Sequence, residues 1–263
     1  MDIWDQHFAA RSPMFAPLRG IGDALAGKVW PPPARLNTLA RERAVVSGGG
    51  QPLCFETLTQ PTAAADYESR IHDDGVVPLR IDNWHDLFNA AAWLAFPRTK
   101  AVLNRAHVAA LQVQQGAVRS PRRDALTLFD ESGVLVLSRS RRVLDDIRAF
   151  AWQRLFWDRR EELLASTRFA VFGHALFEKA LSPYVGMTGH ALLIETTDRT
   201  AGDDLDVVAA DAVLGGITQP RDLSPLPVLG VPGWWDANHD AAFYANTAYF
   251  RPGRSRESGS AHR

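Results

Sequence analysis

The residue types best suited to chemistry gather in one aromatic-rich segment, NWHDLFN, at positions 83–89. His85 and Asn89 are four residues apart, so on a helix they share a face, with Asp86 one step round. Aromatic neighbours favour burial, and a buried polar group must be paired or used. We therefore expect His85, Asp86 and Asn89 to act as catalytic groups, with Trp84 against the substrate. The alternative is a set of core side chains that bond to the backbone, with Asp86 stabilising the helix start.

A second pair with useful spacing is His174 and Glu178, which follow Gly173 at an expected helix start. A histidine nitrogen and a carboxylate oxygen one helical turn apart can hold the same metal ion. With His85 as the third ligand, the set favours zinc, manganese or iron over calcium, which prefers an all-oxygen shell. The same spacing also suits a helix cap or a simple ion pair.

Charged residues in the middle of the chain suggest how a substrate could be held. Arg122 and Arg123, in a predicted loop, can bind a small anionic ligand. Asp124 heads a predicted strand, where it could serve as a catalytic carboxylate. Lys100, on the helix after that of His85, could complete a polar pocket against His85. The alternatives are an ion pair between Asp124 and a neighbouring arginine, and a solvated helix face for Lys100.

The elements that must position these residues follow from the hydrophobic pattern. Asn83 is a good N-cap for a helix reaching about Ala95, and Pro97 suits the first position of a helix reaching Gln115. Two turn sequences, HDDG at 72–75 and DESG at 130–133, indicate β-hairpins. Their predicted arms are residues 67–71 with 76–81, and 126–129 with 134–137. One long amphipathic helix is predicted over 141–164, strands over 168–172 and 191–195, and helices after Gly173 and over 203–214.

This mixture of elements has no regular alternation of strand and helix, so it predicts an α+β fold. We expect a single domain over residues 1–252, with hairpins packed against several helices, and a disordered polar tail over 253–263.

Composition narrows the function classes. The chain has 263 residues, a formal net charge of −1 and one cysteine, so neither a disulfide framework nor a multi-cysteine metal site is expected. The near-neutral charge makes nucleic acid an unlikely partner. No signal peptide or membrane-spanning run is recognisable, so a cytoplasmic location is expected and a membrane partner is not. Glycine-rich nucleotide motifs and the GxSxG motif are absent.

Several segments together resemble a bacterial protein family, DUF3025. They are the residues at 83–89, FPRTK at 96–100, RDALTLFDE at 123–131, GHA at 173–175 with Glu178, and PLPVLGVPGW at 225–234. The resemblance extends from about Trp4 to Pro252. It implies a bacterial protein of one domain and assigns no activity, cofactor or catalytic residue.

Two functions are consistent with these residues. The first is a metal-assisted hydrolase acting on a small anionic substrate. The second is a non-catalytic protein that binds a ligand or partner through the surroundings of Trp84, Trp93 and Trp234. The two separate on geometry: only the first requires His85, Asp124 and His174 to converge within reach of one metal ion.

Overall fold

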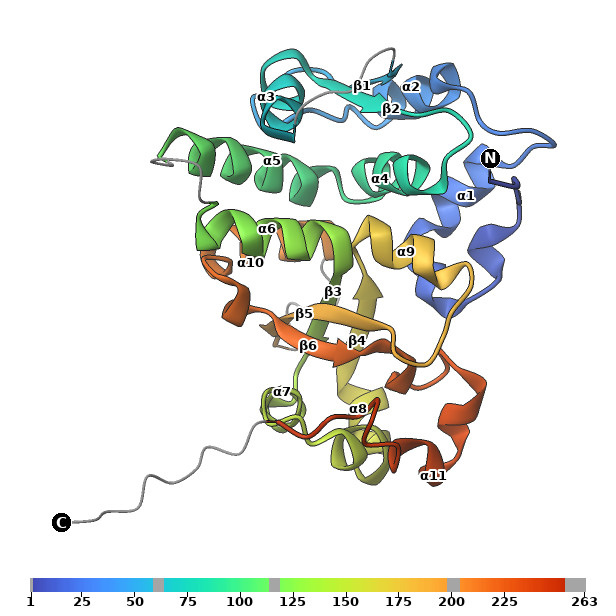
Figure 1. Ribbon diagram of the computed structural model, residues 1–263, viewed down its shortest axis with the longest axis vertical. Helices are drawn as coiled ribbons and strands as arrows, with labels where there is room; N and C mark the ends of the chain where they lie inside the picture. The colour runs from blue at the N-terminus through green and yellow to red at the C-terminus, as the bar shows by residue number, and fades with distance from the viewer. Residues whose placement is uncertain (1, 59–63, 114–118, 198–203, 254–263) are drawn as a thin grey trace.

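Helices and two small sheets are stacked in layers in the computed structural model, which describes residues 2–58, 64–113, 119–197 and 204–253 (Figure 1). Helices α4 and α5 lie between the sheet β1–β2 with α3 and the pair α6 and α9, which in turn covers the four-stranded sheet. Helices α7 and α8 lie at the far side of that sheet. The α+β class predicted from the sequence is confirmed.

The first half of the chain builds the upper layers, and its N-terminal 3-10 turn at Pro13–Leu18 lies beside α9 and β4 (Figure 1). Its helices and strands are α1 (Arg19–Leu25), α2 (Pro33–Glu42), β1 (Cys54–Thr57), α3 (Ala64–Asp74), β2 (Val76–Leu79), α4 (Trp84–Ala95) and α5 (Pro97–Gln112), after short 3-10 turns at Phe8–Ala10 and Pro13–Leu18.

The second half builds the lower layers. It comprises α6 (Pro121–Ser132), β3 (Gly133–Ser138), α7 (Arg141–Arg148), a π-helical turn (Arg154–Asp158), α8 (Arg160–Ser166), β4 (Thr167–Val171), α9 (His174–Ala180), β5 (Thr188–Glu195), α10 (Leu205–Gly216), β6 (Ser224–Pro227) and α11 (Ala241–Tyr244). Short 3-10 turns lie at Pro220–Asp222, Val228–Gly230 and Asp236–His239.

The strands of the larger sheet are ordered β4-β3-β5-β6. The central strand β3 is antiparallel to β4 and parallel to β5, and β5 is antiparallel to β6. Every residue of β3 is buried, as its uninterrupted apolar sequence favours for a strand covered on both faces. The proline-rich β6 lies at the sheet edge, where a missing N–H is tolerated.

The first predicted hairpin does not form. Residues 67–71 belong to α3, and β1 pairs with β2 in parallel across that helix. Tyr67 and Ile71 are one helical turn apart, and Ile71 is buried, so the apolar spacing is helical. Gly75 has a φ of 73°, the left-handed conformation that ends helices, so HDDG is a helix C-terminus.

The second predicted hairpin is also wrong. Residues 126–129 lie in α6, which leads directly into β3. Ser120 caps this helix, its Oγ accepting a hydrogen bond from the Arg123 amide at 3.3 Å, and Pro121 occupies the first helical position. Only the return arm, which is β3, was predicted correctly.

The predicted helix over 141–164 is divided into α7, the π-helical turn and α8. Phe150 has a φ of 55° after the end of α7, which no continuous helix allows. By contrast α4, α5, α9 and the strands β4 and β5 lie close to their predicted positions. The tail from residue 254 falls outside the described residues, so the predicted boundary near 252 stays a prediction.

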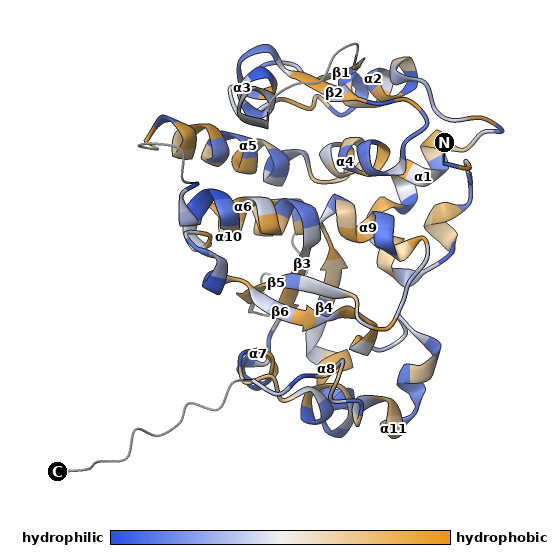
Figure 2. Cartoon of the chain, viewed as in Figure 1, coloured by the Kyte–Doolittle hydropathy of each residue, from blue (hydrophilic) through white to orange (hydrophobic). Residues whose placement is uncertain are grey.

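Among the described residues, none of the helices is both long enough and apolar enough to span a bilayer. Figure 2 shows that both ends of α6 are hydrophilic while its middle is hydrophobic, so this helix carries polar groups at two separate places.

Candidate metal centre

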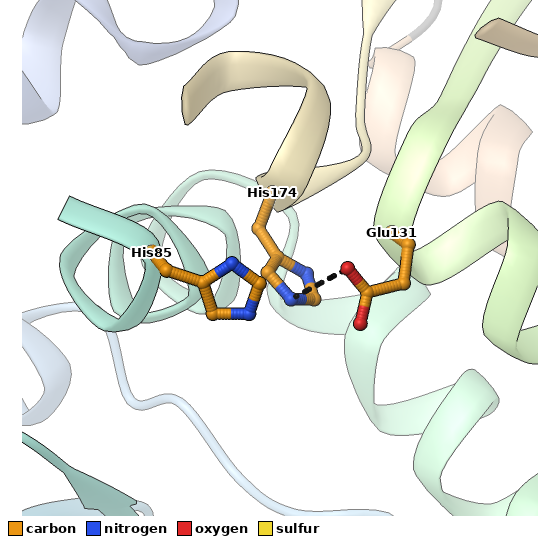
Figure 3. A group of neighbouring side chains, drawn as sticks. All are labelled: His85, Glu131 and His174. Carbon is orange, nitrogen blue, oxygen red and sulfur yellow. Dashed lines mark ion pairs between the residues drawn. The ribbon is translucent and has the colours of Figure 1, made fainter. Parts of the chain in front are cut away.

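Three helices bring two imidazoles and one carboxylate together. His85 from the first turn of α4, His174 from the first residue of α9 and Glu131 from the end of α6 each offer a ligand atom, and these atoms lie within 4.8 Å of one another. His174 Nε2 is 3.6 Å from a Glu131 oxygen, and the two imidazole centroids are 4.7 Å apart (Figure 3). Such a group can coordinate one divalent metal ion.

Local sequence explains why α9 can approach α6 so closely. Gly173 precedes His174, and a Cβ atom at Gly173 would lie 2.4 Å from the backbone nitrogens of Ser132 and Gly133. The absence of a side chain therefore lets the start of α9 lie directly against the end of α6, where Glu131 is. On the other side Asn83 caps α4, accepting a hydrogen bond from the Asp86 amide at 3.0 Å, and so fixes the turn that carries His85.

Burial differs strongly within the group. The His174 side chain is 7% exposed, whereas His85 is 31% and Glu131 42% exposed. Burial lowers the pKa of His174 to about 4, although the carboxylate and the main chain of Asp130 act in the opposite direction. His174 is therefore neutral near pH 7, the form that ligates metal. Burial, and then the charge of Asp130, raise the pKa of Glu131, so a cation at the centre would stabilise its carboxylate.

A carboxylate lies behind each histidine. Glu178 Oε2 is 2.9 Å from His85 Nδ1, which leaves His85 Nε2 as the available nitrogen. Asp130 Oδ2 is 3.8 Å from His174 Nδ1, and this buried nitrogen has no hydrogen-bond partner among the described residues. Metal-bound histidines in proteins usually donate the other ring N–H to a carboxylate, a backbone carbonyl or water, which sets the tautomer and ring orientation.

Asp130 is in turn held by a buried chain of hydrogen bonds. Lys100 Nζ donates to Asp130 Oδ1 at 2.6 Å and to Asn89 Oδ1 at 2.9 Å, and Asn89 Nδ2 donates to the Tyr67 hydroxyl at 2.8 Å. Burial by itself would raise the pKa of Asp130, but the ammonium of Lys100 together with the nearby His174 and His107 holds it below its usual range. The structure therefore places Asn89 and Lys100 in a buried network of hydrogen bonds next to Asp130.

The other acid on α4, Asp86, is engaged with Arg80. Asp86 Oδ2 accepts hydrogen bonds from the backbone and Nε of Arg80 at 2.6 and 2.9 Å, and Oδ1 accepts one from Nη2 at 2.8 Å. This interaction ties the end of β2 to α4. Arg80, which sequence reasoning missed, also lies within electrostatic reach of Glu178 at the edge of the centre.

The remaining predicted site residues lie elsewhere. Asp124, Arg122 and Arg123 occupy the first turn of α6, and Asp124 is seven residues before Glu131, about 10 Å along the helix. Asp124 pairs with Arg119 at 3.3 Å, the structural alternative considered for it. Trp84 is 6% exposed, and its ring centroid is 5.1 Å from that of Trp4.

Asp130 and Glu131 were assigned to a hairpin turn from the sequence. Once residues 121–132 are recognised as a helix, both carboxylates fall in its last turn, next to the negative end of the helix dipole. Carboxylates are unfavourable at this end of a helix, so their position indicates that Asp130 and Glu131 have a role other than stabilising the helix.

The protein is therefore an α+β protein with a histidine–carboxylate cluster where α4, α6 and α9 meet. The family described as "Protein of unknown function (DUF3025)" matches residues 55–254, and the chain belongs to this family. No curated protein and no solved structure is similar enough to match the chain.

Proposed function

We propose that the protein is a metal-dependent hydrolase whose ion is bound by His85, His174 and Glu131. The observation that supports this is the convergence of their three ligand atoms from three different helices. The Nε2 atoms of both histidines would be the ligand atoms, because Glu178 occupies Nδ1 of His85 and Asp130 lies behind Nδ1 of His174. Glu178, expected from its spacing to be a ligand, is assigned the role of orienting His85.

The charges around the centre favour a cation. Asp130, Glu131 and Glu178 are three carboxylates within reach of the two imidazoles, and Lys100 is paired with Asp130 alone among them. Two nitrogens and one carboxylate oxygen suit zinc, with manganese and iron as the alternatives.

A metal with three protein ligands has a position open to water, and the partial exposure of His85 and Glu131 gives solvent access to it. A zinc ion bound there would supply Lewis-acid chemistry and would lower the pKa of a coordinated water toward 7. It also attracts an anionic or polarised oxygen of the substrate. Arg80, whose side chain is 59% exposed, is the basic group proposed to assist a small anionic substrate at the rim.

A binding protein without catalysis is the second candidate. Its expected aromatic surface is not available, because Trp84, Trp93 and Trp234 are each at most 9% exposed.

The test measures metal content and hydrolysis together. Purified wild-type protein is loaded separately with zinc, manganese and iron, dialysed, and assayed on p-nitrophenyl phosphate and p-nitrophenyl acetate. We expect about one ion per chain and metal-dependent turnover, both lost in His174→Ala and Glu131→Gln. His239→Ala is the matched control, since this exposed histidine lies in a distant 3-10 turn. Bound metal without turnover of either substrate would favour the binding role.

A further inference from the structure

Lys100 is a buried charge that the proposed chemistry does not use. Its side chain is 5% exposed, and its ammonium lies 5.4 Å from the centre of the Trp93 ring. It lines a small polar cavity together with Tyr67, His107 and Asp130. Burying a lysine is unfavourable unless the charge is paired, and an apolar pair of similar size would often be at least as stable. Its presence therefore calls for a role beyond packing.

The hydrogen bonds of Lys100 hold its ammonium in one position. Two of its three donors are directed to Asn89 Oδ1 and Asp130 Oδ1, so the ammonium is fixed between α4 and α6. Asn89 is itself fixed by the Tyr67 hydroxyl. Because Lys100 occupies Oδ1 of Asp130, the other oxygen, Oδ2, is the one that faces Nδ1 of His174.

We propose that Lys100 is a positioning residue, which acts on the metal centre through Asp130 and His174. This inference rests on the proposed function, since it concerns the same metal. Lys100 fixes the Asp130 carboxylate, and the carboxylate keeps the proton of His174 on Nδ1, which leaves Nε2 as the ligand atom. His174 Nδ1 lies 3.8 Å from Asp130 Oδ2 and has no hydrogen-bond partner in the described part of the chain, so it is the nitrogen that this arrangement would satisfy once a metal polarises the ring.

The alternative is that the Lys100–Asp130 pair only holds α5 against α6. Removing both charges together distinguishes the two roles. Lys100→Met or Asp130→Asn alone leaves a buried charge without its partner, which destabilises the fold for either role. The double variant Lys100→Met/Asp130→Asn lacks both charges of this pair and should fold, so its metal affinity can be measured on folded protein.

The experiment measures zinc affinity by competition with a chromophoric chelator, and the visible spectrum of the cobalt-substituted protein. The variants are Lys100→Met, Asp130→Asn and the double variant. Lys179→Met is the matched control, because this lysine is exposed on α9, the helix that carries His174. We expect each of the three to bind zinc about 10- to 100-fold more weakly than wild type, with an altered cobalt spectrum and an unchanged stoichiometry. Lys179→Met should match wild type.

The double variant decides whether Lys100 acts through Asp130. Residues that act through one another have non-additive effects, so the double variant should bind zinc no more weakly than Asp130→Asn. The inference would be overturned if the losses of zinc affinity in the two single variants multiplied in the double variant. It would also be overturned if the double variant had the zinc affinity and cobalt spectrum of wild type. In both cases the proposed metal site would stand. A wild-type protein that binds neither zinc nor cobalt would overturn the proposed function and this inference with it.

Discussion

Glu178 Oε2 lies 2.9 Å from His85 Nδ1, so the carboxylate of α9 is bonded to the histidine of α4 and not grouped with His174 on its own helix. Spacing along one helix predicted the opposite arrangement. Tertiary packing of α4 against α9 determines which side chains pair, because it brings His85 next to Glu178 and leaves His174 facing Glu131.

This relationship separates the roles of two glutamates. Glu178→Gln keeps a group able to bond to His85 but removes its charge, so we expect zinc affinity to fall by about 10- to 100-fold with one ion still bound at saturation. Glu131→Gln removes the proposed ligand and should abolish stoichiometric binding. Equilibrium dialysis of both variants with zinc checks the assignment. Equal losses in the two variants would show that Glu178 is a ligand as well.

Gly173→Ala should disturb both the fold and the centre. The new Cβ would meet the backbone of Ser132 and Gly133, which cannot move aside as a flexible side chain can. We expect a loss of about 1–3 kcal/mol in the free energy of unfolding, typical of overpacking, together with weaker metal binding. Gly215→Ala is the control, since no atom of the described residues lies within 4 Å of the added atom, and it should be neutral or slightly stabilising. Urea denaturation measures both, and an unaffected Gly173→Ala would contradict the close approach.

Asp206 of α10 is predicted to be a major source of stability. It caps α5 from a distant part of the chain, since its side chain accepts hydrogen bonds from the amides of Arg98 and Thr99 at 2.8 and 2.9 Å and from the Thr99 hydroxyl at 2.7 Å. Asp206→Ala should reduce the free energy of unfolding by about 2–4 kcal/mol, because buried donors lose their partner. Asp211→Ala, at an exposed position of the same helix, should change it by less than about 0.5 kcal/mol. Thermal unfolding of the two variants gives the comparison.

The pH dependence of stability in the metal-free protein should report the burial of His174. Its pKa is lowered from 6.5 to about 4 in the folded protein, so the unfolded chain takes up the proton first. The free energy of unfolding should therefore fall as the pH is lowered from about 6.5 to about 4, by ~3 kcal/mol from this residue.

His107 and His190, whose pKa values burial also lowers, add a change of the same sign. His174→Gln should retain the contributions of His107 and His190 to the pH dependence and lack that of His174. Its free energy of unfolding should therefore fall less steeply with decreasing pH than that of wild type. Denaturation at several pH values in the presence of a chelator measures this difference. Identical slopes for the two proteins would contradict a neutral, buried His174.

The sequence predicted elements well where local signals agreed. Asn83 as a cap and Pro97 as a first helical residue correctly located α4 and α5. It failed where a glycine-ended turn sequence was taken for a hairpin, since Asp-Asp-Gly at 73–75 and Glu-Ser-Gly at 131–133 each end a helix. Whether such a sequence forms a hairpin turn or a helix end depends on packing against α5 and the larger sheet. These tertiary contacts cannot be predicted from the local sequence.

The same error hid part of the site. His85 and His174 were chosen from their types and surroundings, and the fold brings them together. Glu131 was missed because it was assigned to a turn, whereas Asp124 was chosen because a strand was expected after it. Partners such as Glu131 and His85, 46 positions apart in the chain, are determined by tertiary contacts between helices, which spacing in one element cannot predict.

The most direct test of the metal centre is the zinc content of wild-type protein and of His174→Ala after loading and exhaustive dialysis. We predict about one zinc ion per wild-type chain and none in His174→Ala, with His239→Ala equal to wild type. A wild-type protein that stays free of zinc, manganese and iron, or a His174→Ala variant that retains a full equivalent, would contradict the proposed metal centre.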